Sequence, residues 1–146
     1  MIEVYTKGEV HLPPRQLQKI FLDHINLDRF FNAKFSLVRK SDSENPNGLG
    51  AIRLVDVGIA KFKEEIVFVT DTELHYKVIG DRVPVKHHMG KIKWTPCDTG
   101  RCLFEYSITC TSNSPVPNFI LKWALQRELD QMLTKLQQFA AENRLT

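Results

Sequence analysis

Five side chains that could carry out acid–base chemistry lie in segments with strand-like sequence: Arg53, Glu64, Tyr76, His88 and Tyr106. A histidine or a carboxylate can act as a general base, and a tyrosine hydroxyl or a guanidinium can stabilise an enolate. The same groups can also anchor the polar end of a ligand that is not chemically changed. Which of these roles is open to them depends on whether the fold brings them together.

The charged residues of each segment indicate which strand face points to solvent, because side chains alternate between the two faces of a strand. In segment 60–69, for example, Lys61, Lys63 and Glu65 are expected to point outward. The same reasoning for segments 73–79, 85–95 and 101–112 predicts these inward residues: Phe62, Glu64, Ile66, Phe68, Leu74, Tyr76, Val78, His88, Gly90, Ile92, Trp94, Cys102, Phe104, Tyr106, Ile108 and Cys110.

The turns between these segments predict which inward residues are neighbours. In an antiparallel pair of strands, the residue numbers of two paired residues always add up to the same sum. A two-residue turn at 58–59 pairs Arg53 with Glu64, and a turn centred on Asp71 pairs Ile66 with Tyr76. The first pair is a candidate ion pair between neighbouring strands.

Two further turns extend the same inference. A turn centred on residue 82 sets Tyr76 against His88, and one centred on residue 98 sets His88 against Ile108 and Gly90 against Tyr106. We therefore expect the five polar side chains on one otherwise apolar face. A β-bulge in any strand would shift this pairing.

A structural role is also open to each polar residue. Arg53 and Glu64 can form an ion pair at the edge of the core, the tyrosines can pack there, and His88 can be a core histidine with satisfied hydrogen bonds. We predict no catalytic residue. If a ligand binds, the expected contacts are Arg53, Glu64, Ile66, Phe68, Tyr76, His88, Ile92, Trp94, Phe104 and Tyr106.

The spacing of the metal-binding residue types predicts neither a metal site nor a cofactor. Cys97, Cys102 and Cys110 form no Cys-x-x-Cys pair, and their odd number favours reduced thiols. His87 and His88 point to opposite faces of a regular strand, so they cannot chelate one ion together.

The elements that must position these residues follow from periodicity and turn residues. Segment 2–10 is predicted as a strand, Pro13 and Pro14 begin a short helix, and 26–33 form a second short helix with Asn26 as its N-cap. Further strands are predicted at 35–41, 49–57, 60–69, 73–79, 85–95 and 101–112, and a long helix at 119–142. The apolar stripe of this helix, widened at its start by Ile120, Trp123 and Ala124, must pack on the sheet.

Composition points to an ordinary globular protein. The 146 residues are 42% hydrophobic and 25% charged, with a net charge of +3 that is spread along the chain, so nucleic acid is not expected as a partner. No apolar run is long enough for a membrane span, and the first residues lack the pattern of a signal peptide. We expect one domain over 1–146, in the cytoplasm, without stable membrane insertion; the oligomeric state is not predicted.

The order and spacing of these elements resemble the START/Bet v 1-like (SRPBCC) superfamily, and within it the polyketide cyclase/dehydratase and lipid-transport group. The resemblance rests on Pro13-Pro14 before the first helix, on 48–53 opening the third strand, and on 76–80 followed by Pro84. It implies an α+β helix-grip fold, in which a curved antiparallel β-sheet wraps around a long C-terminal helix, with two short helices after the first strand. It also implies a cavity, which relatives use for lipids, sterols, quinones, hormones or polyketides.

Three functions remain open at this point. The first is a binding or carrier domain for a small, largely hydrophobic ligand such as a lipid, a polyketide or a quinone. The second is a cyclase- or dehydratase-like enzyme that uses general acid–base chemistry in the same cavity, with His88 or Glu64 as the base. The third is a protein-interaction module. A large pocket favours the first two functions, and a collapsed core with an exposed apolar patch favours the third.

Overall fold

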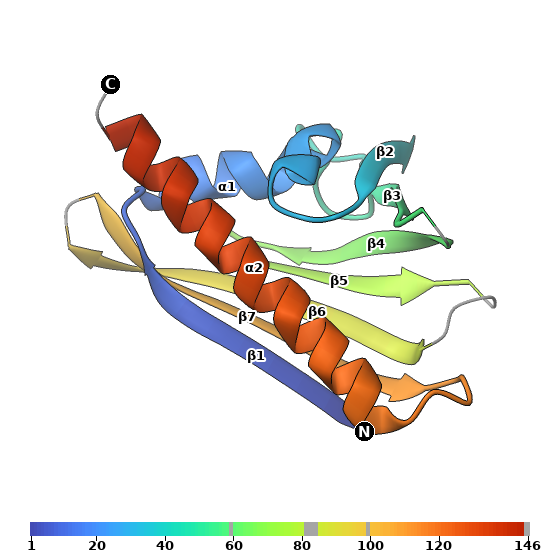
Figure 1. Cartoon of the computed structure of the whole chain (residues 1–146). Helices are drawn as coiled ribbons and strands as arrows, with labels where there is room; N and C mark the ends of the chain where they lie inside the picture. The colour runs from blue at the N-terminus through green and yellow to red at the C-terminus, as the bar shows by residue number, and fades with distance from the viewer. Residues whose placement is uncertain (59, 81–84, 99, 145–146) are drawn as a thin grey trace.

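A seven-stranded antiparallel sheet and a long C-terminal helix make up most of the chain (Figure 1). The computed structural model describes residues 1–58, 60–80, 85–98 and 100–144. In chain order the elements are β1 (Ile2–Val10), α1 (Pro14–Leu22), the 3-10 helix η1 (His24–Arg29), β2 (Lys34–Arg39), β3 (Ile52–Asp56), β4 (Lys61–Val69), β5 (Glu73–Ile79), β6 (Val85–Asp98), β7 (Arg101–Ser112) and α2 (Asn118–Arg144). This is the helix-grip α+β fold predicted from the sequence.

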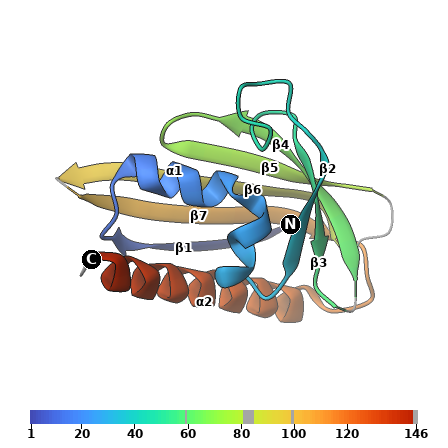
Figure 2. The ribbon, with the colours of Figure 1, turned by 90° about the horizontal axis from the view of Figure 1, so that it is seen from above.

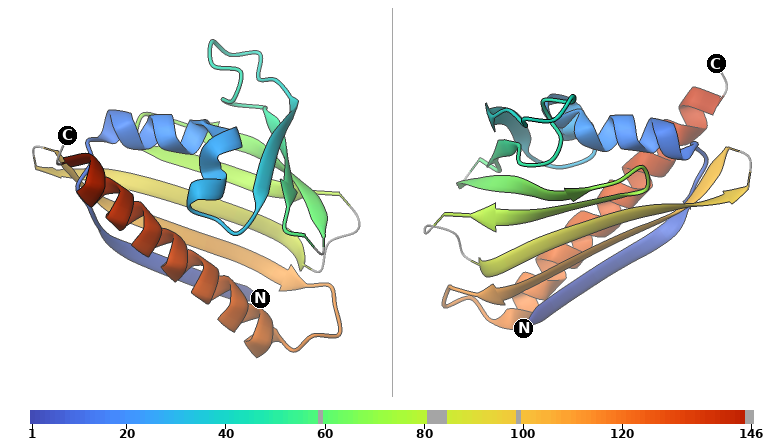
Figure 3. Two further views of the ribbon diagram at one scale, coloured as in Figure 1. Left: turned by 45° about the horizontal axis from the view of Figure 1, so that its top comes forward. Right: turned by 180° about the vertical axis from the view of Figure 1, so that it is seen from behind.

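The strands follow one another as a meander, except that β1 pairs with β7 at one edge. The order across the sheet is β1-β7-β6-β5-β4-β3-β2. All helices lie on one face of the curved sheet, as the view from behind shows (Figure 3). Helix α2 runs alongside β1 on this face of the sheet (Figure 2). On the same face, α1 contacts β6 and η1 contacts β2.

The core is built from alternate residues of the strands and from one side of each helix. On β7, every second residue from Cys102 to Cys110 is buried. Phe21 of α1 stacks on Trp94 and Phe104, with ring centroids 5.8 and 5.4 Å apart. The buried residues of α2 begin only at Leu129.

The first two turns of α2 are more exposed than the sequence pattern predicts. Phe119, Ile120 and Trp123 are 73%, 43% and 60% exposed. The expectation that the stripe packs on the sheet from its start is therefore wrong for this part. Leu121 and Leu125 on its inner side are partly buried against the core and also border a cavity.

The predicted short helix at 26–33 is shorter and earlier than expected. Residues His24–Arg29 form a 3-10 helix, and Asn26 lies inside it. The Asn26 side chain donates to Asp23 Oδ2 at 2.8 Å, so it does not cap a following helix. The strands predicted at 2–10, 73–79 and 101–112 match the observed β1, β5 and β7.

Candidate functional site

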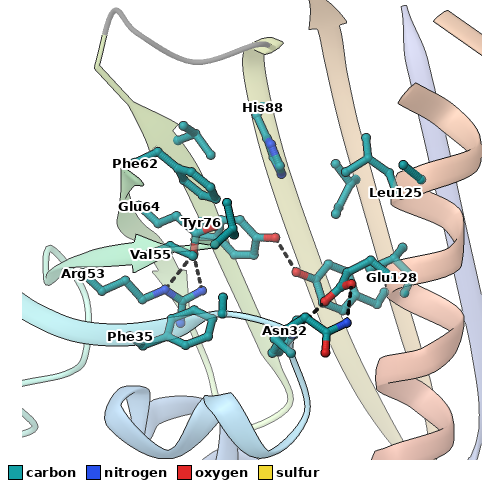
Figure 4. A pocket seen from close by; sticks show the side chains of 18 of the residues that line it. Asn32, Phe35, Arg53, Val55, Phe62, Glu64, Tyr76, His88, Leu125 and Glu128 are labelled. Atoms are coloured by element: carbon teal, nitrogen blue, oxygen red, sulfur yellow. Dashed lines mark hydrogen bonds and ion pairs between the residues drawn. The ribbon is translucent and has the colours of Figure 1, made fainter. Parts of the chain in front are cut away.

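A cavity of about 540 Å³ lies between the concave face of the sheet and the first half of α2 (Figure 4). Its third wall is the segment between η1 and β2. The lining is mostly apolar, because each wall contributes aliphatic or aromatic side chains. These are Phe31, Ala33 and Phe35 from the segment and β2, Val55, Phe62, Val78 and Ile108 from the sheet, and Leu121, Leu125 and Leu129 from α2.

An ion pair joins β3 and β4 at one end of the cavity. Arg53 and Glu64 are cross-strand partners, and Oε1 of Glu64 accepts from Nε of Arg53 at 2.7 Å and lies 2.6 Å from Nη2. The guanidinium lies over the rings of Phe35 and Tyr76, 5.3 and 5.1 Å from their centroids. Burial raises the pKa of the Glu64 carboxyl, and the Arg53 charge opposes that rise.

Two tyrosines from β5 and β7 meet at the sheet wall of the cavity. The hydroxyl groups of Tyr76 and Tyr106 are hydrogen-bonded to each other (Figure 4). Burial raises the pKa of both hydroxyls above the ordinary value, so both are protonated at neutral pH. One hydrogen bond between two hydroxyls uses only one of their two hydrogens. The pair can therefore donate to a further group.

His88 of β6 points into the cavity with a ring nitrogen that has no protein partner. The side chain is only 8% exposed, and Nε2 forms no hydrogen bond within the described residues. Its ring centroid lies 6.0 Å from that of Tyr76. Burial lowers the pKa of His88 to about 4, so the imidazole is neutral at pH 7 and can act as donor or acceptor.

A hydrogen-bonded contact closes the side of the cavity at α2. Glu128 accepts from the backbone N–H of Asn32 at 3.1 Å and from its Nδ2 at 3.2 Å. Both residues line the cavity. Sequence reasoning missed this contact, because residues 96 positions apart share no local pattern. It also did not assign Phe35 to the cavity.

The structure brings together half of the sequence-predicted site. Arg53, Glu64, Tyr76, His88 and Tyr106 all line the cavity, each from a different strand. That they contact a ligand stays a prediction. Four other candidates are buried in the core and are not among the residues that line the cavity: Ile66, Ile92, Trp94 and Phe104.

The prediction that Phe68 points inward is wrong. A β-bulge between Ile66 and Phe68 breaks the alternation of β4, and Phe68 is 42% exposed. Its ring packs against His75, with centroids 4.7 Å apart. Since Ile66 still pairs with Tyr76, the error is confined to the end of the strand.

The pairing of Arg53 with Glu64 is confirmed, but the pairing of the later strands is shifted by two residues. Tyr76 pairs with Gly90 instead of His88. In the next hairpin Gly90 pairs with Ile108, where Tyr106 was predicted. A shift of two keeps every residue on its predicted face. The turn placed at residue 82 lies outside the described residues. The turn placed at residue 98 is wrong, because β6 extends to Asp98, which pairs with Arg101.

Among the described residues, no cluster of histidine, cysteine or acidic side chains could hold a metal ion. The three cysteines are free thiols; Cys97 is exposed, whereas Cys102 and Cys110 are buried in the core. No helix in the described part of the chain is both long and apolar enough to cross a membrane.

Solved structures with the same fold share little sequence with this chain. A START superfamily protein from Mycobacterium smegmatis superposes with a TM-score of 0.82 at 13% identity, covering 99% of both chains. The protein XoxI from Bacillus cereus gives 0.78 at 17% identity, again over 99% of both. The Zhui aromatase/cyclase from Streptomyces sp. R1128 gives 0.79 at 13% identity, over 99% of this chain and 95% of that one.

Sequence comparison gives a family but no individual relative. No curated protein matches the chain. The family model for polyketide cyclase/dehydrase and lipid transport matches residues 1–140. The START superfamily protein shows that the chain has the fold expected from the resemblance. The family model shows that the chain belongs to the polyketide cyclase/dehydrase and lipid-transport family.

Proposed function

We propose that this chain is a binding or carrier domain for a small, largely hydrophobic molecule, such as a lipid, a polyketide or a quinone. The observation that carries the proposal is the buried His88 Nε2, which faces an apolar cavity of about 540 Å³ and has no hydrogen-bond partner among the residues that the structure describes. That volume lies within the range of roughly 300 to 1,000 Å³ that is typical of ligand pockets.

The polar groups support a ligand with one polar end. A buried nitrogen without a hydrogen bond costs about 1 to 3 kcal/mol, which a ligand oxygen or a bound water near His88 would recover. The Tyr76–Tyr106 pair lies on the same face and has a spare hydroxyl hydrogen. The rest of the ligand would lie against the aliphatic side chains of α2 and the Phe62 ring.

Native mass spectrometry of freshly purified protein tests this proposal. We expect the folded protein to carry a small molecule, which is released on denaturation and identified by its mass. The matched variant is Leu125→Trp, which places an indole in the cavity from α2 and should exclude the molecule. Protein that carries no molecule, and that takes up no neutral hydrophobic dye after purification, would contradict the proposal.

A second candidate is an enzyme that uses general acid–base chemistry in the same cavity. The observation that favours it is a neutral imidazole beside protonated tyrosine hydroxyls, since His88 can take up a proton while Tyr76 or Tyr106 donates to an oxyanion. A dehydratase would leave different molecules on active and inactive protein. If the molecule bound to His88→Gln is heavier than that on the wild type by one water, the enzyme is favoured; identical molecules favour the carrier.

The exposed start of α2 is the feature that bears on a protein-interaction role. Phe119, Ile120 and Trp123 form an apolar group on the outer side of the helix. An interaction module with a vestigial cavity would have a collapsed core, whereas about 540 Å³ is open here. The binding function therefore has the stronger support.

A further inference from the structure

The charges around the cavity are unequal in number. Among the described residues that line it, Arg53 is the only one with a full positive charge, whereas Glu64 and Glu128 are both acidic. His88 is neutral at pH 7, because burial lowers its pKa to about 4. A ligand that enters this cavity therefore meets no surplus of positive charge.

The positive charge of Arg53 is already paired with a carboxylate. Glu64 Oε1 lies within 2.7 Å of two guanidinium nitrogens of Arg53. The rings of Phe35 and Tyr76 lie over the same guanidinium. A ligand carboxylate that approached Arg53 would share its one positive charge with Glu64, so two carboxylates in a desolvated site would have a single counter-charge between them.

The opposite wall also disfavours an anion. Glu128 of α2 lines the cavity and holds Asn32 through both carboxylate oxygens. A second carboxylate in the same partly desolvated space would be repelled, since charges interact more strongly there than in water. The remaining polar groups are His88 and the hydroxyls of Tyr76 and Tyr106, all uncharged.

We infer that the cavity selects uncharged ligands, whose polar end is a hydroxyl, ketone or ester, over carboxylates, and that Glu64 sets this selectivity by neutralising Arg53. The inference rests on the proposed binding function and narrows its substrate class. It separates neutral alcohols, ketones, quinones and esters from fatty acids and other free acids of the same hydrocarbon bulk.

Competition against a neutral fluorescent dye, N-phenyl-1-naphthylamine, tests the inference at pH 7.5. The competitors are 1-dodecanol, methyl dodecanoate and dodecanoate, which share one hydrocarbon chain and differ in charge. We expect the alcohol and the ester to displace the dye at concentrations at least about tenfold lower than the acid, because burial of an uncompensated charge is costly.

The variant Glu64→Gln keeps the shape of the side chain and one acceptor for Arg53, but frees its positive charge. Dodecanoate should then displace the dye at least about tenfold better than it does from the wild type, because Arg53 gains an unpaired charge. The matched control is Glu65→Gln, the next residue along β4, whose carboxylate pairs with Arg39 and Lys77 away from the cavity. For this control, the ratio between the concentrations of dodecanoate and 1-dodecanol that displace the dye should equal that of the wild type.

The outcomes separate this inference from the binding function itself. If the wild type binds the dye but dodecanoate competes as well as dodecanol, or if Glu64→Gln folds and leaves the ratio unchanged, the selectivity is refuted and the cavity still binds. If no dye binds to the wild type, the proposed binding function is contradicted, and the selectivity inference, which rests on it, is overturned as well. If Glu64→Gln does not fold, the wild-type ratio alone decides.

Discussion

Arg53 and Glu64 are directly opposite each other on β3 and β4, and their side chains are only 5% and 7% exposed. Two guanidinium nitrogens approach the same carboxylate oxygen, at 2.6 and 2.7 Å. The pair lies at the cavity wall and holds the Arg53 guanidinium against the Tyr76 ring. It therefore links the packing of the sheet to the chemistry of the cavity.

Breaking this pair on one side should be strongly destabilising. Arg53→Leu leaves the Glu64 carboxylate buried without its partner, which typically costs about 3 to 5 kcal/mol. Replacing both residues by leucine should recover most of that loss, because no buried charge remains. Free energies of unfolding from urea titrations measure both effects.

The control for these single and double variants is the more exposed pair Arg39–Glu65, whose charged atoms are 3.5 Å apart. Replacement of Arg39 by leucine should change the free energy of unfolding by no more than about 1 kcal/mol. A double variant, Arg53→Leu with Glu64→Leu, that is as unstable as Arg53→Leu alone would show that packing around the pair, and not its charge, dominates.

Acid should destabilise the protein through its buried histidines. Burial lowers the pKa of His88 from 6.5 to about 4 and that of His24 to about 3. Each of these histidines takes up a proton near pH 6.5 in the unfolded chain, but only near its lower pKa in the folded chain. The free energy of unfolding therefore falls as the pH drops from 7 towards 4. The His88 share is of the order of 3 kcal/mol.

Melting temperatures at pH 7 and pH 5 test this effect. His88→Gln should lose less stability between these two pH values than the wild type does, because a glutamine takes up no proton. The matched control is His87→Asn, because His87 is exposed and its φ of 53° is tolerated by asparagine. An unchanged pH dependence in His88→Gln would contradict the assignment of His88 as a buried neutral imidazole.

Gly90 should accept no side chain, because it leaves room for Tyr76. The two residues are cross-strand partners on β5 and β6, and a methyl group at Gly90 would overlap the Tyr76 ring. Gly90→Ala should therefore cost about 1 to 3 kcal/mol by overpacking, and should weaken dye binding by displacing the tyrosine. The second variant, Gly90→Ala with Tyr76→Leu, should recover the stability but not the binding. Equal stability of Gly90→Ala and wild type would contradict this account.

The exposed start of α2 and its buried part from Leu129 onward should respond differently to truncated side chains. Leu129 is buried in the core, so Leu129→Ala should lower the free energy of unfolding by about 2 to 5 kcal/mol. Phe119→Ala, nearly three turns earlier on the exposed part, should change it by less than about 0.5 kcal/mol. Comparable losses in thermal or urea unfolding would show that the start of α2 is packed.

The sequence was sufficient to predict the order of the elements and the face on which most strand residues lie. Alternation with period two survives a register shift of two residues, so the predicted inward faces of Tyr76, His88 and Tyr106 are correct although their predicted partners in the β5–β6 and β6–β7 pairs are not. Phe68 was misplaced because a single bulge reverses the alternation, and nothing in the residues of 60–69 marks it.

The composition of the cavity wall could be predicted only in part. Which inward residues face the cavity, and which are covered by α1, depends on the path of the helices across the sheet. Trp94 and Phe104 contact Phe21 of α1 and are core residues for that reason. The contact between Asn32 and Glu128 depends on tertiary packing alone.

The central claim is that the cavity binds a small, neutral hydrophobic molecule, and equilibrium titration with N-phenyl-1-naphthylamine tests it most directly. The wild type should bind the dye saturably at one site, and Leu125→Trp should abolish that binding at an unchanged melting temperature. The control Val38→Trp, at an exposed position of β2 outside the cavity lining, should bind as the wild type does. No saturable binding to the wild type, or equal binding to the folded Leu125→Trp protein, would contradict the account.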